Sequence, residues 1–381
     1  MSEDKMNTQP KHVDYNDLPI DLQKSFYHPI CNKEEIERIF DLQDGSDYLL
    51  KLRADTIIDH MRLFRVYRNK ALEMGENWSL EDSFEKQHII NVRNKLPQEL
   101  QSKFDSITFG NIFSTEPNGD IFNSEFGIIS TISDSLKYFV EYMNLGLGDF
   151  NQEVPMHIRK NAIRIAIRVM LQTEALDFKM DPRGIIPKSI QDSMSSTYPF
   201  QMQFLIGHEF AHYILGHLKE DNTVEKFLIK AMFSSQTDYA KINSYTVSQK
   251  KELEADIYAI KIPLYDDMEM KLIFESTLHF FADLAIYEAV KDCLFPPIGY
   301  QTHPDAMSRY YNLLDNIKKP KDFNNEYFNE ELPKLVREYK EIFIDDVSCF
   351  TDEYETYGSV YLDKPNTKWR GRELIDRVDY Y

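Results

Sequence analysis

The stretch that decides both the fold and the chemistry is LIGHEFAHYI, residues 205–214. It contains the spacing HExxH within an otherwise apolar run. On a helix, residues four apart lie on one face about a turn from each other, so His208 and His212 can offer ring nitrogens to one metal ion. Glu209 then lies beside that ion, where a carboxylate can take a proton from zinc-bound water and pass it to the leaving amine. The motif therefore predicts a zinc hydrolase.

The residues around the motif predict a buried helix. Apolar side chains recur at helical spacing, at Phe204, Leu205, Phe210, Ala211 and Ile214. An unpaired ionisable cluster would be costly to bury in such a helix, and metal binding removes that cost. The alternative is a helix that carries its histidines incidentally.

The residues after the motif exclude the metzincin pattern. That pattern needs Gly at 215 and His at 218, where this chain has Leu215 and Leu218. His217 lies five residues beyond His212, about 140 degrees around a helix axis, which makes it a poor ligand. We expect His217 to form a hydrogen bond at the end of the helix instead.

A third ligand is predicted from KELEADIYA, residues 251–259. On a helix, Glu252, Asp256 and two small alanines share one face, which would let this helix approach the HExxH helix closely. Glu252 is the predicted third ligand. Asp256, one turn later, is placed to accept the outer N–H of a ligating histidine. Glu254 points away and is expected in solvent, although it remains an alternative ligand.

These motifs resemble those of gluzincin peptidases. HEFAH, ELEAD and the later THPD, residues 302–305, are similar to the HtpX and CaaX-processing type over about a third of the chain. The resemblance implies a zinc ion held by His208, His212 and Glu252. It also implies that Glu209 is the general base, and that Asp256 contacts a ligating side chain without binding the metal itself.

The same resemblance assigns a role to the later histidine. In that family a residue of the HP segment helps to stabilise the oxyanion, which implies His303 as a catalytic residue here. Arg309 is an alternative donor for the same purpose. Equally, His303 could cap the helix that runs from Asp305 to Leu314.

Composition narrows the classes of partner and the compartment. The net charge of −19 argues against general nucleic-acid binding and favours basic or neutral polypeptide partners. No apolar run approaches the roughly 18 residues of a membrane span, and the first residues lack the pattern of a signal peptide. The three cysteines are few and widely spaced, which fits a reducing compartment. We therefore expect a cytoplasmic protein.

The predicted fold class is α+β and mostly helical, a zincin-like metallopeptidase with a small antiparallel sheet and an HExxH helix. The expected divisions are a disordered N-terminus at 1–20, a helical region at 21–105, the metallopeptidase domain at 106–318, and a C-terminal helix and tail at 319–381. Strands are predicted at 107–109, 112–113, 121–122 and 126–131. Helices are predicted at 133–142, 157–176, 200–218, 248–260, 268–294, 305–317 and 326–343.

Two segments are candidates for the walls of a cleft. An edge strand can pair with an extended peptide, and residues 127–131 are the candidate, although a central strand fits their sequence equally well. The loop at residues 180–187, which precedes the HExxH helix, forms either one rim of the cleft or a plain connector.

The function predicted from these features is that of a zinc-dependent endopeptidase of narrow specificity, acting on a protein or peptide substrate. A role in stress, toxin or phage-defence responses would parallel proteins of the ImmA or Lit type, and the N- and C-terminal regions would serve a regulatory partner. One alternative is a zinc-stabilised sensor or interaction protein without turnover, against which Glu209 argues. A small-molecule metallohydrolase is another.

Overall fold

The computed structural model describes residues 18–113, 119–148, 154–219, 242–296, 304–363 and 375–376. These residues are mostly helical and include a small mixed sheet, so the fold class is α+β. The first helices of the chain are α1 (Ile20–Ser25), α2 (Lys33–Phe40), α3 (Gly45–Ile58), α4 (Met61–Met74), η2 (Gly75–Asn77), η3 (Glu81–Ser83), α5 (Gln87–Lys95) and α6 (Gln98–Asp105).

The sheet has three strands, β1 (Ile107–Ile112), β2 (Gly119–Ser124) and β3 (Gly127–Ser133). Their order is β1-β3-β2, with β3 parallel to β1 and antiparallel to β2. The prediction of an antiparallel sheet is therefore wrong for one of its two pairings. The reason is that β2 and β3 form a hairpin through the tight turn at 124–127, whereas β1 joins the far side of β3.

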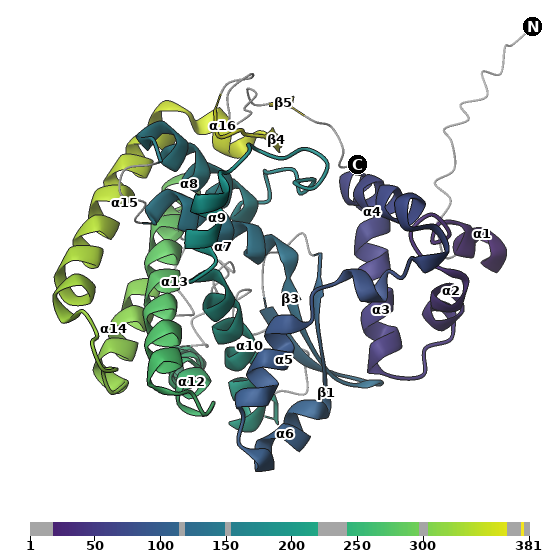
Figure 1. Ribbon diagram of the computed structural model, residues 1–381, viewed down its shortest axis with the longest axis horizontal. Coiled ribbons are helices and arrows are strands. Elements are labelled where there is room, and N and C mark those ends of the chain that lie inside the picture. The colour runs from purple at the N-terminus through teal and green to yellow at the C-terminus, as the bar shows by residue number, and fades with distance from the viewer. Residues whose placement is uncertain are drawn as a thin grey trace, which may run out of the picture.

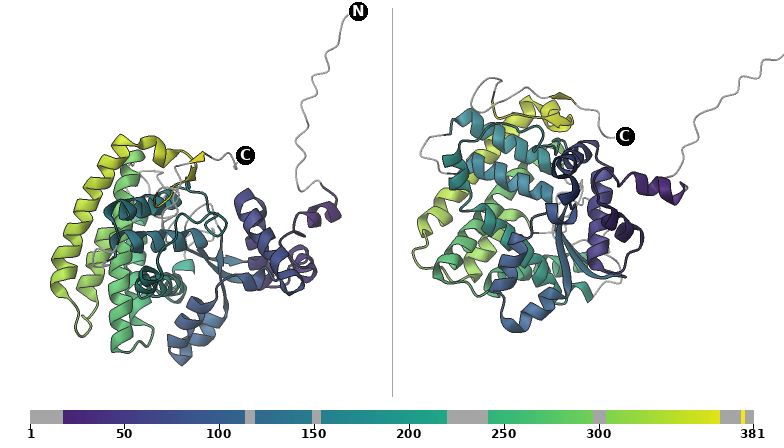
Figure 2. Two further views of the ribbon diagram at one scale, coloured as in Figure 1. Left: turned by 45° about the horizontal axis from the view of Figure 1, so that its top comes forward. Right: turned by 45° about the vertical axis from the view of Figure 1, so that its right-hand side comes forward.

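Helices cover both faces of this sheet. Helix α3 packs against β1 and β3, and the guanidinium of Arg53 donates to the carbonyl of Asn111 at 2.7 Å. On the other face lies α10 (Tyr198–Ile214), which packs against β2 and β3. Figure 1 shows α1–α4 on one side of the sheet and the large helical layer on the other, and Figure 2 shows the same division from two further directions.

The helical layer is built around α13 (Asp267–Leu294), which contacts α7, α8, α10, α12, α14 and α15. Its other members are α7 (Asp134–Leu147), α8 (Met156–Met170), α9 (Lys188–Met194), η4 (His217–Lys219), α12 (Ile242–Lys261), α14 (Ala306–Asn316), the π-helical turn η6 (Tyr327–Glu331), α15 (Leu332–Cys349) and α16 (Thr351–Glu355). A short strand pair follows, β4 (Gly358–Ser359) with β5 (Ile375–Asp376). Within the described residues, no helix is both long and apolar enough to cross a membrane.

The predicted helices at 248–260, 268–294 and 305–317 are confirmed by α12, α13 and α14. The helix predicted at 157–176 ends earlier, at Met170, because Gln172 adopts a positive φ of 62° that a helix cannot contain. Helix α9 and the pair β4–β5 were not predicted, since short elements carry little periodicity.

Five buried charged side chains join distant parts of the chain. Glu174 accepts from Arg168 at 2.8 Å and from Arg183 at 2.7 Å. Arg183 also donates to Asp177, which pairs with Arg62 of α4. The backbone of residue 360 donates to Glu174 as well, so this network ties the C-terminal segment to the centre of the molecule.

Candidate metal centre

The HExxH motif lies in α10, whose sequence favours a helix that is buried all round. Pro199 occupies its first turn, where the missing N–H costs no hydrogen bond. Every residue from Gln201 to His212 is buried. The three motif residues His208, Glu209 and His212 are fully buried, each with none of its surface exposed.

The second motif lies in α12, which packs directly on α10. Small side chains allow this approach: a Cβ at Gly207 of α10 would lie 3.3 Å from the carbonyl of Ala259. Glu252 and Asp256 are buried on the face towards α10, while the side chain of Glu254 is 61% exposed. The predicted helical phase of residues 252–259 is therefore confirmed.

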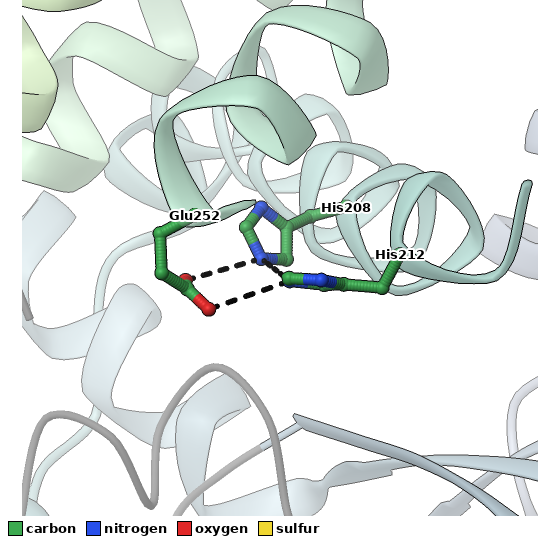
Figure 3. A group of neighbouring side chains, drawn as sticks. All are labelled: His208, His212 and Glu252. Carbon is green, nitrogen blue, oxygen red and sulfur yellow. Dashed lines mark hydrogen bonds and ion pairs between the residues drawn. The ribbon is translucent and has the colours of Figure 1, made fainter. Parts of the chain in front are cut away.

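The two helices bring His208, His212 and Glu252 together. The Nε2 atoms of His208 and His212 are 2.9 Å apart, and each of them lies 3.5 Å from a carboxylate oxygen of Glu252. Figure 3 shows the two rings projecting from one helix towards the carboxylate on the other. Within the residues described, this buried group could hold a metal ion.

The donor set fits a metal ion such as zinc. Donors bound to a tetrahedral zinc ion lie roughly 3.3 Å from one another, close to the separations found here. Burial lowers the pKa of His212, which keeps its ring in the neutral form that ligates metals. Burial alone would raise the pKa of Glu252, but His212, His208 and Arg309 outweigh it and hold that pKa well below its usual range. Burial would lower the pKa of His208, but Asp256 and Glu252 outweigh it and raise that pKa to about 9, so a metal ion at this centre would displace a proton from His208.

Asp256 holds the outer nitrogen of His208. Its carboxylate lies 2.9 Å from Nδ1 of the ring, in the supporting position predicted for it. Arg309 of α14 donates to both oxygens of Asp256, at 2.8 and 2.5 Å, and its guanidinium lies over the ring of Phe281. Arg309 is thus buried behind the ligands, where it fixes Asp256. This position disfavours its predicted alternative role as an oxyanion donor.

His217 holds the outer nitrogen of His212. The two Nδ1 atoms are 2.8 Å apart, and Nε2 of His217 lies 3.8 Å from the exposed carboxylate of Glu254. If His212 ligates through Nε2, its Nδ1 carries the proton and donates to His217, whose own proton is then on Nε2. The expected hydrogen bond of His217 at the helix end is therefore present, and its partner is His212 in the last turn of α10. Gly216, with a φ of 76°, ends the helical path of the chain just before His217.

Glu209 lies beside the cluster with no hydrogen-bond partner for either oxygen among the described residues. Burial raises its pKa well above the usual range, and Asp120 and Glu252 act in the same direction while His208 opposes them. The first residue of β2, Gly119, leaves room for this carboxylate: a Cβ there would lie 2.7 Å from Oε1. The contact with β2 was not predicted.

Three further predictions concern the strand at 127–131, the loop at 180–187 and His303. The candidate edge strand at 127–131 is β3, the central strand, so it cannot pair with a peptide; β2 is the edge strand nearer α10. The loop at 180–187 contributes Ile186 to a separate cavity beside α7 and α9. His303 lies outside the described residues.

Comparison with known protein families, with curated proteins and with solved structures found no match for this sequence.

Proposed function

We propose that this chain is a zinc-dependent peptidase of the gluzincin type, which hydrolyses peptide bonds of a protein substrate. One arrangement carries the proposal: His208, His212 and Glu252 meet in a fully buried group, and the carboxylate of Glu209 lies next to it without a hydrogen-bond partner among the described residues.

The number of donors favours a catalytic over a structural ion. Structural zinc sites are closed by four protein ligands, whereas catalytic sites use three and leave one position open. Three donors gather here within the part of the chain that the structure describes. A zinc ion in such a site supplies Lewis acidity, which makes water more acidic and polarises a carbonyl group.

Glu209 supplies the proton transfer in this proposal. Its oxygens accept no hydrogen bond from any described residue, so they are available to a water molecule. A carboxylate whose pKa is raised by burial can take a proton from water and return it to the leaving nitrogen. A structural site would have no use for such a group.

Strand β2 supplies the binding of an extended peptide. It pairs only with β3 among the described strands, so its outer edge has no strand partner there, and its first residue meets Glu209. A peptide that extended the sheet along β2 would form main-chain hydrogen bonds and lie beside the base. This geometry favours a polypeptide over a small molecule as the substrate.

Mass spectrometry of a proteome-derived peptide library incubated with the full chain tests the proposal. We expect cleavage that a zinc chelator abolishes and that Glu209→Gln reduces by roughly 10²–10⁴-fold, because the variant keeps the shape but loses the base. The variant should retain about one zinc per chain, as measured by elemental analysis. A library left uncut by zinc-loaded protein, or cut equally by the variant, would contradict a peptidase and favour a zinc-stabilised interaction protein.

A further inference from the structure

Two lysines from distant parts of the chain meet where α4 packs against the segment between α8 and α9. Lys70 lies in α4, and Lys179 lies in that segment. Asp177 of the same segment pairs with Arg62 of α4 and with Arg183. These ion pairs hold the two parts of the chain together, and they engage the carboxylate of Asp177 with cations other than the two lysines.

The ammonium groups of Lys70 and Lys179 are neighbours at hydrogen-bond distance, although the ordinary form of each is positively charged. Lys70 is half-buried, and its ammonium group lies over the ring of Tyr67, 4.5 Å from the centroid. Neither lysine forms an ion pair with a described residue or donates to one of its oxygen atoms. Two adjacent positive charges repel, so an anion placed against both of them would be bound favourably.

The nearest carboxylate does not compensate for this contact. Asp134, the first residue of α7, lies near both lysines, but it accepts from Asn111 at 2.9 Å and forms no ion pair with a described residue. Burial and the contact with Lys179 lower the pKa of Lys70 to about 7, and Lys137 acts in the same direction. Asp134 opposes this shift without cancelling it. The lysine pair therefore lacks a full counter-charge within the part of the chain that the structure describes.

The charges of the pair favour a small dianion as the ligand. A phosphate group carries nearly two negative charges at neutral pH and offers three acceptor oxygens, enough for both ammonium groups. A metal cation would be repelled. A long polyanion such as nucleic acid would be repelled by the rest of the molecule, whose net charge is −19.

We propose that Lys70 and Lys179 bind a phosphate group, either inorganic phosphate or the phosphate ester of a small molecule, with one ammonium group against each side of it. The bound group joins α4 to the segment between α8 and α9, beside the ring of Tyr67. Lys70 takes up a proton on binding, because a neighbouring anion favours the charged form of an amine. The proposal does not depend on the function proposed for the metal centre, since α4 and α10 lie on opposite sides of the sheet (Figure 1).

Acetylation of the full chain, measured lysine by lysine, tests this site. The protein is treated near neutral pH with an acetyl N-hydroxysuccinimide ester, with and without inorganic phosphate, at an ionic strength held constant with chloride. Mass spectrometry of peptides gives the rate at each lysine. Without phosphate, Lys70 should react at least roughly tenfold faster than Lys188, an exposed lysine of α9 that pairs with Asp192, because an amine reacts only after it has lost its proton. Saturating phosphate should slow Lys70 at least roughly tenfold and leave Lys188 unchanged.

Lys179→Met is the matched variant, and the exposed position of Lys179 means that the fold should tolerate it. In this variant Lys70 should react more slowly than in the wild type, because the neighbouring charge is gone, and phosphate should no longer protect it. Phenyl phosphate is the second probe. Protection at a lower concentration than inorganic phosphate requires would identify an ester as the ligand, and the reverse order would identify the free ion.

Thermal melting gives a second measurement, which decides alone if Lys70 is too sheltered to react with the reagent. Phosphate should raise the Tm of the wild type by more than that of Lys179→Met, whereas Lys188→Met should respond as the wild type does. An equal rise in the wild type and Lys179→Met would overturn the proposal. So would equal protection of Lys70 and Lys188, or protection of Lys70 that persists in Lys179→Met. A complete lack of protection would leave a neutral Lys70 that accepts a hydrogen bond from Lys179 and binds no anion.

Discussion

The Nδ1 atoms of the two motif histidines, on the side of each ring away from Glu252, contact different kinds of partner. Asp256 offers His208 a charged oxygen that is itself fixed by two hydrogen bonds from Arg309. His217 offers His212 a ring nitrogen, which accepts a proton only in one tautomer. His217 can therefore hold the ring of His212 only when its own proton is on Nε2, the nitrogen that faces Glu254.

Replacing His217 tests this dependence. In His217→Ala the outer nitrogen of His212 loses its acceptor, and we expect zinc affinity to fall roughly 10–100-fold, the usual effect of removing such a partner. Competition with a chromogenic chelator measures it. His217→Gln, whose amide oxygen can accept the same proton, should retain most of the affinity. A zinc affinity of His217→Ala equal to that of the wild type would show that His217 does not position the ligand.

Glu252 and Glu254 offer a matched pair of substitutions on one helix. Glu252 is buried against the two histidines, and Glu254 is 61% exposed. Glu252→Gln removes the charged oxygen donor, so the purified protein should hold far less than one zinc per chain. Glu254→Gln should hold about one. Elemental analysis after dialysis measures both, and the reverse order would mean that Glu254 is the ligand.

The local part of the site could be predicted from sequence because it depends on helix geometry alone. The spacing of His208 and His212, and the shared face of Glu252 and Asp256, follow from residues per turn. The partner of His217 could not be predicted in this way. It depends on the backbone of Gly216, which leaves the helix, and a positive φ at one glycine has no periodic signature.

At the scale of elements, the long helices could be predicted and the order of the strands could not. Periodicity reports which residues of a helix are buried, as in α13, and needs no knowledge of its neighbours. The place of a strand in a sheet is set by distant pairings. Two strands that follow closely in the sequence, such as β1 and β2, suggest a hairpin, yet β3 lies between them.

The approach of β2 to α10 gives a prediction at this scale. Gly119→Ala places a methyl group where Oε1 of Glu209 lies, within 2.7 Å of it, and about 3.1 Å from Ile132. We expect the carboxylate to move and peptide cleavage to fall by roughly a hundredfold, as small misplacements of a catalytic group do. Zinc content should stay near that of the wild type, since the atoms nearest to the new methyl group belong to Glu209 and Ile132 and not to the three proposed ligands.

The control for Gly119→Ala lies on the same strand. Asn123 is exposed near the other end of β2, so Asn123→Ala should leave cleavage unchanged. Cleavage rates and zinc content are measured together for both variants. Full activity in Gly119→Ala would mean that Glu209 is not confined by β2.

At the scale of the whole molecule, the buried network around Glu174 lies beyond prediction from one sequence. Arg62 and Asp177 are 115 positions apart, and Arg168 donates to the carbonyl of Glu353, 185 positions away. Nothing in the spacing of these residues marks them as partners, because each side chain alone has the pattern of a solvated charge. Only the packed chain shows that they are buried together.

Breaking this network should destabilise the whole fold. Glu174 accepts from two fully buried arginines, so Glu174→Gln leaves the positive charges of Arg168 and Arg183 buried with less compensation. Removing one partner of a buried ion pair typically costs about 3–5 kcal/mol of unfolding free energy. Urea denaturation followed by circular dichroism should show a loss of this size. Asp192→Asn breaks the exposed pair with Lys188 and should cost at most about 1 kcal/mol. If both variants unfold at the same urea concentration, the network contributes no more than a surface pair.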